Sequence, residues 1–380
     1  MSFAAPLAAG HRLEPLEVAR LPGFRDDDLM AAFATFRASS AAIVAGQAEL
    51  RPGKAADTGL RAVCRAALSV TIADPSAAAR FFETHFAPHR VVPIDGAGHS
   101  QRGFLTGYYE PVVAASPVRT ADFATPILAR PADLESFDAI VTIGPLAGLA
   151  AARRRGDGGR EPFPDRAAIE DGALGAAAQA VAWVRDPIER FLIQVQGSAR
   201  LRWPDGSTAR LVYSGRNGQP YTSIGRILVE EGHVPADRMS LAALKQWVRA
   251  QGQDAGAPGC ALMRRNRSFV FFRLENAGDP AAGPIGAAGL SLTRLRSIAV
   301  DRTLWPYGLP FWIDADIPWS EPKPTPFRRL MVAQDTGSAI VGPARADIFF
   351  GSGDEAGARA GDIRHPGDFV VFLPAMEGRP

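Results

Sequence analysis

The chain from Ser268 onward is a succession of short apolar segments broken by glycine and proline, and this feature restricts the fold most. The segments have the length and the β-branched and aromatic content of strands, and no helical crossover of ordinary length separates them. They read SFVFFRLE, RSIAVD, FWIDADI, RLMVAQD, ADIFF and DFVVFL. Such a succession favours a closed β-barrel over an open parallel sheet.

The first hundred residues have the pattern of helices. DDDLMAAFATFRASSAAIVAG opens on acids and ends in Gly46, and TGLRAVCRAALSV and PSAAARFFETHFAPH space their apolar residues three and four apart. We expect the phenylalanines of these helices in the core, namely Phe33, Phe36, Phe81, Phe82 and Phe86.

The middle of the chain changes character at GFLTGYYEPVVAASPV, residues 103–118, which is β-like. The runs RFLIQVQGSARLRW and TARLVYSG, on either side of PDGS, predict a β-hairpin. On that assignment Gln194 and Gln196 share one face of a strand. YTSIGRILVEEG and SLAALKQWVRAQ follow with helical spacing, and Ser240 is the expected N-cap of the second.

Composition excludes several classes of function. The 380 residues are 47% hydrophobic and 22% charged, as in a globular protein, and a net charge of +2 gives no electrostatic basis for a nucleic-acid partner. The six histidines are scattered and no CxxC or HExxH pattern occurs, so we expect no metal and no cofactor. Cys64 and Cys260 are far apart, and whether they form a disulfide stays open.

The N-terminal residues lack a basic flank followed by a long apolar core, so no export signal is visible. No run of 18 or more apolar residues occurs elsewhere. We expect a water-soluble chain, which is compatible with the mature form of an exported protein.

Two aspartates interrupt apolar strand-like segments in Val332–Ile348, VAQDTGSAIVGPARADI, and lie twelve positions apart. Asp301 has a similar position, at the end of RSIAVD. A buried carboxylate costs several kcal/mol unless it is paired or hydrogen-bonded. The fold therefore either satisfies Asp335 and Asp347 structurally or keeps a carboxylic acid ready for chemistry.

Ordered blocks from Gly103 to the C-terminus resemble a known family. They are GYYEP, IQVQGSAR, YSGRNGQPYTSIGRIL, NRSFVFF and QDTGSAI…ADIFFGSGDEAGARAG. Together they are similar to the membrane-bound lytic murein transglycosylase A family, which carries a C-terminal three-aspartate domain.

The resemblance implies a fold that is mainly β with N-terminal helices (α+β). A double-psi β-barrel and the helices would form one domain, residues 1–108 and 232–380, interrupted by a smaller β domain, residues 109–231. A glycan strand would bind in a groove between them, where ligand sites commonly form.

The resemblance also implies a peptidoglycan lytic transglycosylase, which cleaves the MurNAc–GlcNAc β-1,4 bond without water and leaves 1,6-anhydro-MurNAc ends. One carboxylic acid of the enzyme suffices because the substrate's own hydroxyl is the nucleophile. The pKa of that acid must be raised so that it is protonated when needed. By motif position this acid/base is Asp347, and its aromatic neighbours favour the neutral form. Asp335 would act as its electrostatic helper or stabilise an oxocarbenium ion, and Asp301 would be mainly structural.

Further residues are candidates for substrate contact, and each also has a structural interpretation. Glu110 is a substrate-facing or loop residue, or a second acid, and the two glutamines bind either sugars or backbone groups. The full candidate set is Tyr108, Tyr109, Glu110, Gln194, Gln196, Gly197, Ser198 and Asp301.

Two departures from the family accompany the resemblance. Val341 stands where many relatives carry a lysine, and Ala358 where relatives often carry a histidine. The family's N-terminal lipid-anchoring cysteine does not occur in this sequence. We expect a monomer in the periplasm of a Gram-negative bacterium. Membership of cell-wall synthesis or hydrolysis complexes and association with the outer membrane stay open.

Two alternatives stay open. An inverting hydrolase would use Asp335 as the base that activates water and Asp347 as the acid, with the carboxyl groups about 6.5–9.5 Å apart. A non-catalytic peptidoglycan-binding protein would keep the groove without turnover.

Overall fold

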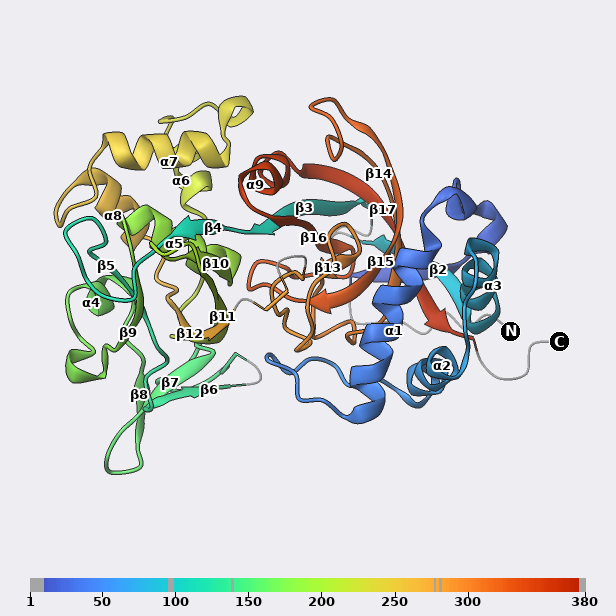
Figure 1. Cartoon of the computed structure of the whole chain (residues 1–380), viewed down its shortest axis with the longest axis horizontal. Helices are drawn as coiled ribbons and strands as arrows, with labels where there is room; N and C mark the ends of the chain where they lie inside the picture. The colour runs from blue at the N-terminus through green and yellow to red at the C-terminus, as the bar shows by residue number, and fades with distance from the viewer. Residues whose placement is uncertain (1–9, 95–98, 138–139, 277, 280–281, 376–380) are drawn as a thin grey trace. The chain divides into compact units, whose positions relative to one another are not determined.

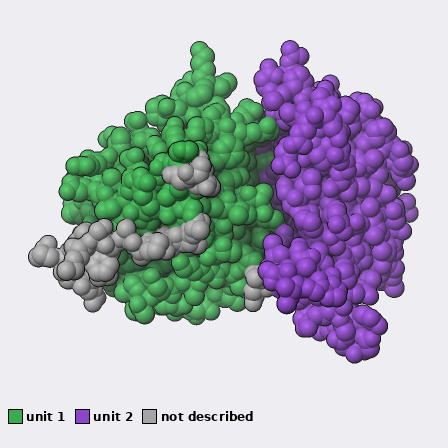
Figure 2. Space-filling model, turned by 180° about the vertical axis from the view of Figure 1, so that it is seen from behind, with its two compact units in different colours: residues 1–109, 285–351, 359–380 green, residues 110–284, 352–358 purple. Residues whose placement is uncertain are grey.

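A computed structural model of the chain describes residues 10–94, 99–137, 140–276, 278–279 and 282–375. The chain divides into two compact units, which Figure 2 shows in different colours. Unit 1 comprises residues 1–109, 285–351 and 359–380, and unit 2 comprises residues 110–284 and 352–358. The chain returns to unit 1 at Ile285, and not at residue 232 as expected from the sequence.

A closed barrel of six strands forms the centre of unit 1 (Figure 1). The order around it is β17, β14, β15, β13, β16 and β3, and β3 pairs again with β17. The strands are β3 (Gly103–Glu110), β13 (Ser297–Ala299), β14 (Pro310–Ile317), β15 (Thr325–Asp335), β16 (Arg345–Ser352) and β17 (Arg364–Pro374). Closure pairs both edges of every barrel strand, which removes exposed sheet edges. The predicted barrel is confirmed, but the first of the predicted segments, SFVFFRLE, is wrong as a barrel strand, because it forms most of β12 (Val270–Asn276) in a separate sheet of unit 2.

Two further strands, β1 (His11–Pro15) and β2 (Phe86–Pro93), continue the sheet outward from β17. Helices α1 (Leu29–Ala45), α2 (Thr58–Ser69) and α3 (Pro75–His85) connect them, and α9 (Asp354–Gly361) precedes β17. The first three helices each begin after an aspartate N-cap, namely Asp28, Asp57 and Asp74. Each cap satisfies a free backbone N–H and contributes about 1 kcal/mol.

The predicted phenylalanine core of these helices is confirmed. Phe36 and Phe82 are fully buried, and their ring centroids are 6.0 Å apart in an edge-on contact. Phe33 packs edge-on against Phe81 at 5.0 Å, and Phe36 against Phe86 at 5.5 Å.

Unit 2 contains three small sheets and five α-helices among its described residues. The strands are β4 (Val112–Ala114), β5 (Thr125–Leu128), β6 (Leu134–Ser136), β7 (Ala151–Arg154), β8 (Arg160–Pro162), β9 (Ala180–Val184), β10 (Ala199–Arg202), β11 (Thr208–Arg216) and β12 (Val270–Asn276). The helices are α4 (Arg166–Glu170), α5 (Pro187–Gln196), α6 (Ile224–Glu230), α7 (Leu241–Ala250) and α8 (Pro258–Arg264). The predicted hairpin is formed by β10 and β11, with Arg202 paired to Thr208.

Unit 2 is longer and more helical than the sequence led us to expect. Its strand β12 pairs with β11 along most of its length, which draws residues far beyond 231 into the four-stranded sheet. Helices α5 to α8 share one apolar cluster, to which Ile188, Leu228, Val248 and Met263 contribute. Burial of these side chains explains why residues 232–284 stay with unit 2.

No helix among the described residues is long and apolar enough to cross a membrane. Cys64 and Cys260 are both buried and both free, so they form no disulfide with each other in the described chain.

Candidate active site

Asp335 and Asp347 lie on either side of the short strand β13 in unit 1. Ala299 of β13 is in register with Asp335 on β15 and with Asp347 on β16. Adjacent strands are about 4.8 Å apart, so the two aspartate backbones are about 10 Å apart, in one row across the barrel wall. The residue between them has only a methyl side chain.

Three donors hold the carboxyl group of Asp335. The backbone N–H groups of Ala287 and Thr336 donate to Oδ1 at 2.9 and 2.8 Å, and the hydroxyl of Tyr108 donates to Oδ2 at 2.9 Å. Burial raises the pKa of Asp335, while these hydrogen bonds and the positive charge of Arg51 lower it. Donors to a carboxylate favour the ionised form.

Among the described residues, a single donor holds the carboxyl group of Asp347. The hydroxyl of Thr106 donates to its Oδ1 at 2.7 Å, and no described residue forms a hydrogen bond with its Oδ2. Burial raises the pKa of Asp347 to about 6, which Arg345 and Thr106 oppose and the negative charge of Asp335 supports. A carboxyl group with this pKa can both give and take a proton near neutral pH.

Tyr108 lies against both aspartates. Its ring is 5.4 Å from that of Phe349 and belongs to a small apolar cluster with Leu292, Ala299 and Ile340. Burial and the charges of the two aspartates raise its pKa well above the usual range of a tyrosine. The phenol therefore stays protonated and remains a donor to Asp335.

Arg345 supplies a positive charge that lowers the pKa of Asp347. Its Nη2 donates to the hydroxyl of Thr106 at 2.8 Å, and its guanidinium lies 5.4 Å from the centre of the Phe104 ring. The sequence analysis missed both Thr106 and Arg345. Each lies two positions before a chosen residue, Tyr108 or Asp347, so each shares that residue's strand face.

The carboxylate of Asp301 accepts hydrogen bonds from loop residues of unit 1. Its Oδ1 accepts hydrogen bonds from the backbone N–H and the hydroxyl of Thr303, and its Oδ2 accepts one from the N–H of Gly342. These contacts join the loop between β13 and β14, which contains Asp301 and Thr303, to the loop between β15 and β16, which contains Gly342. A mainly structural role for Asp301 stays a prediction.

Glu110 belongs to unit 2 and is completely buried. Its carboxylate forms ion pairs with Arg210 at 2.7 Å and Arg200 at 3.3 Å, and it accepts a hydrogen bond from Ser352 at 2.6 Å. All its described partners lie in the same unit. Its neighbour Tyr109 is also buried, at 5% exposure.

The strand predicted to carry Gln194 and Gln196 is helix α5, so the two glutamines do not share a strand face. Asp186 caps this helix, Pro187 occupies its first turn, and Gly197 ends it with φ of 79°. These signals outweigh the short alternating pattern RFLIQVQ. A period of two places side chains on one strand face but on different sides of a helix.

Gln194 bridges other parts of unit 2. Its Oε1 accepts from Arg166 at 2.7 Å, and its Nε2 donates to the carbonyl of Val270 at 3.1 Å. This is the backbone-serving role that the sequence analysis left open. Ser198 follows the helix and is buried.

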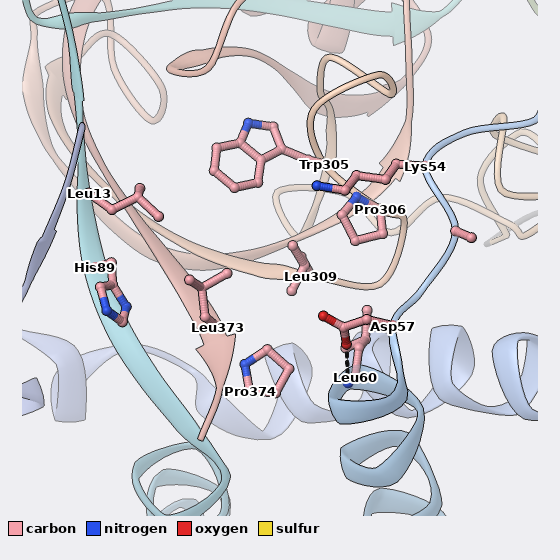
Figure 3. A pocket seen from close by; sticks show the side chains of 11 residues that line it. Leu13, Lys54, Asp57, Leu60, His89, Trp305, Pro306, Leu309, Leu373 and Pro374 are labelled. Atoms are coloured by element: carbon pink, nitrogen blue, oxygen red, sulfur yellow. Dashed lines mark hydrogen bonds between the residues drawn. The ribbon is translucent and has the colours of Figure 1, made fainter. Parts of the chain in front are cut away.

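A cavity of about 230 Å³ lies elsewhere in unit 1 (Figure 3). Leu13, Trp305, Leu309 and Leu373 supply apolar walls, and Lys54 lies at its side. Neither Asp335 nor Asp347 lines it. Among the described residues, no group of three histidine, cysteine or acidic side chains is arranged to hold a metal ion.

Family comparisons cover both parts of the chain. The MltA specific insert domain matches residues 104–273, and the 3D domain matches residues 296–373. The membrane-bound lytic murein transglycosylase A of Vibrio cholerae is 35% identical over 57% of this chain and 57% of its own length. The chain thus spans little more than half of that relative. The Escherichia coli protein of the same name is 32% identical over 74% of this chain and 68% of its own length.

Solved structures agree with these matches. A membrane-bound lytic murein transglycosylase from Agrobacterium tumefaciens has 34% identity and a TM-score of 0.80, covering 95% of this chain and 97% of that one. E. coli MltA with bound chitohexaose has 26% identity and a TM-score of 0.62, covering 97% of this chain and 92% of that one. The chain belongs to the membrane-bound lytic murein transglycosylase A family.

Proposed function

We propose that this protein is a lytic transglycosylase that cleaves the MurNAc–GlcNAc β-1,4 bond of peptidoglycan and leaves 1,6-anhydro-MurNAc ends. The observation that carries this proposal is the unequal environment of two neighbouring carboxyl groups. From the described residues Asp335 accepts three hydrogen bonds, whereas Asp347 accepts one and has a pKa raised to about 6. Burial raises the pKa of both groups, but the three donors to Asp335 favour its ionised form, whereas Asp347 can carry a proton, which separates the two roles.

Asp347 acts first as the acid. Its proton passes to the glycosidic oxygen as the bond from that oxygen to C1 of the muramic residue breaks, and positive charge develops on the sugar ring. Asp347, now a carboxylate, takes the proton of the muramic C6 hydroxyl while the C6 oxygen bonds to C1. The acid is regenerated and no water is consumed, so a second carboxyl group is not required as a base.

Asp335 supplies fixed negative charge to this reaction. Its hydrogen bonds with Ala287, Thr336 and Tyr108 orient the carboxylate before the substrate arrives. A preoriented anion stabilises the developing oxocarbenium charge without a cost of reorganisation. It also keeps the pKa of Asp347 raised.

The substrate class is supported by the family and by the related structure that holds chitohexaose. We take the barrel to be of the double-psi type, supported by the 3D domain match and by the parallel pairing of β13 with β15. We further propose a location in the envelope of a Gram-negative bacterium, on the periplasmic side, which is supported by the relatives from Vibrio cholerae and Escherichia coli. Tyr108 and Tyr109 remain candidates for glycan contact, along with Gly197 and Ser198.

Mass spectrometry of the soluble fragments released from purified peptidoglycan tests this proposal. The wild type is expected to release anhydro-muropeptides, and Asp347→Asn is expected to lose more than 99% of this activity, on the order of the loss of one catalytic acid. Asp354→Asn is a matched control, because Asp354 is an exposed acid at the start of α9. It should retain wild-type activity.

The other outcomes identify the alternatives. Reducing-end products would show a hydrolase in which Asp335 activates water, and Asp335→Asn would then abolish turnover as completely as Asp347→Asn. Binding to peptidoglycan that is equal in the wild type and Asp347→Asn, with no fragments from either, would show a binding protein.

A further inference from the structure

The contacts of Asp347 extend beyond Thr106 to a second residue and form a chain with a definite direction. Nη2 of Arg345 lies 2.8 Å from Oγ1 of Thr106, which lies 2.7 Å from Oδ1 of Asp347. A guanidinium can only donate hydrogen bonds. Oγ1 of Thr106 therefore accepts from Arg345, and its single hydrogen is left for Asp347.

This direction decides which oxygen of Asp347 can carry a proton. Oδ1 accepts the hydrogen of Thr106, so in the neutral acid the proton resides on Oδ2. Oδ2 is also the oxygen for which no described residue provides a hydrogen bond. The proton therefore lies on the oxygen that is free to meet a substrate.

The strand geometry holds this chain in place. Phe104 and Thr106 share one face of β3, and Arg345 and Asp347 share one face of β16, because each pair is two residues apart. β3 and β16 are neighbours in the barrel. The guanidinium of Arg345 is fixed from two further directions, since Nη1 donates to the carbonyl of Ala346 at 2.5 Å and the group packs on the Phe104 ring.

We propose that Arg345 and Thr106 are positioning residues that orient the carboxyl group of Asp347 and fix its proton on Oδ2. This role rests on the proposed function of Asp347 as the acid. Arg345 acts through Thr106 and through its charge, and need not touch the substrate.

The charged and polar groups around Asp347 show why the effect of Arg345 and Thr106 on its pKa matters. Burial and Asp335 on β15 raise its pKa, while Arg345 on β16 and Thr106 on β3 lower it; Tyr108 on β3 is neutral. An acid that must next act as a base works best with a pKa close to the ambient pH. Without the two positioning residues the proton would bind too tightly for the second step.

A carbon-13 NMR titration of the aspartate carboxyl carbons tests this proposal without substrate, and the Asp347 signal is assigned by its loss in Asp347→Asn. Thr106→Val should raise the pKa of Asp347 by about one unit, since it removes the only hydrogen bond that a described residue donates to the carboxylate. Thr106→Ser keeps a hydroxyl and should restore the wild-type titration. Arg345→Met should raise the pKa, and Arg345→Lys should restore it in part, because it keeps the charge but loses the planar fork.

Arg294→Met is the matched control. Arg294 lies beside β16 and not on it, and its Nε donates to the carbonyl of Phe350 of that strand. This variant should leave the Asp347 titration unchanged. Unaltered titrations in Thr106→Val and Arg345→Met would overturn the proposal. If Thr106→Val does not fold, Thr106→Ala removes the same hydroxyl, and Arg345→Met tests the other end of the chain.

The pH dependence of the enzyme's activity is a second measurement. Variants of residues with a merely structural role would not shift it. In Thr106→Val and Arg345→Met, the descending limb of kcat/KM should shift to higher pH by as many pH units as the pKa of Asp347 rises in the NMR titration. This limb reports the pKa of the acid in the free enzyme. If the variants shift the titration of Asp347 but the wild type releases no anhydro products, the positioning role stands and the proposed function is rejected. If the wild type releases anhydro products but the variants leave the titration unshifted, the proposed function stands and the positioning role is rejected.

Discussion

At the scale of single residues, two aspartates in similar apolar segments acquire different properties from the donors around them. The sequence alone singles out Asp335 and Asp347 as candidates, because charged residues in strand-like segments are costly unless they are satisfied or used. The donors to Asp335 come from residues as distant in sequence as Tyr108 and Ala287. Sequence spacing alone could not identify them.

The raised pKa of Asp347 predicts a cost in stability at neutral pH. Its folded pKa of about 6 lies above the value of about 3.9 in the unfolded chain. Between these values the folded state binds more protons, so the free energy of unfolding falls as pH rises from about 4 to about 6, by up to about 3 kcal/mol. Asp347→Asn should therefore be more stable than the wild type at pH 7 and close to it at pH 4.

Urea unfolding of both proteins at the two pH values measures this difference. Asp354→Asn serves as the control again, since an exposed acid should change stability little at either pH. Equal stability of Asp347→Asn and the wild type at pH 7 would show that burial of the charge costs little in this fold.

At the scale of elements, helix α5 shows where sequence patterns compete. The short run RFLIQVQ alternates like a strand, but a cap, a first-turn proline and a terminal glycine define a helix around it. The strands of the barrel and the hairpin of β10 and β11 were predictable, because their alternation and turn residues agree. The extension of unit 2 to Pro284 was not, because it depends on the long-range pairing of β11 with β12.

The C-terminal glycine of α5 provides a test of this account. Gly197 has φ of 79°, and a Cβ there would meet no other atom within 4 Å. Gly197→Ala should therefore cost about 1 kcal/mol through backbone conformation alone. Gly156→Ala is the control, because Gly156 is equally uncrowded but has no positive φ. Urea unfolding of both variants makes the comparison, and equal stabilities would contradict the assigned helix end.

At the scale of the whole molecule, the chain passes between the two units at four places, after residues 109, 284, 351 and 358. Glu110 and Ser352 begin two of the segments of unit 2, and their hydrogen bond joins the segments at their first residues. Unit 2 is therefore held together by a buried polar network at the points where the chain enters it.

This arrangement predicts that Glu110 stabilises unit 2 and takes no part in the chemistry. Glu110→Gln would leave Arg200 and Arg210 without their carboxylate, and breaking a buried pair in this way costs about 3–5 kcal/mol. Differential scanning calorimetry should show a lowered transition for unit 2. The pKa of Asp347, measured by NMR, should not change. A lowered affinity for glycan at unchanged stability would instead give Glu110 a role in substrate binding. Thermal stability therefore separates a residue that builds the fold from one that binds the glycan.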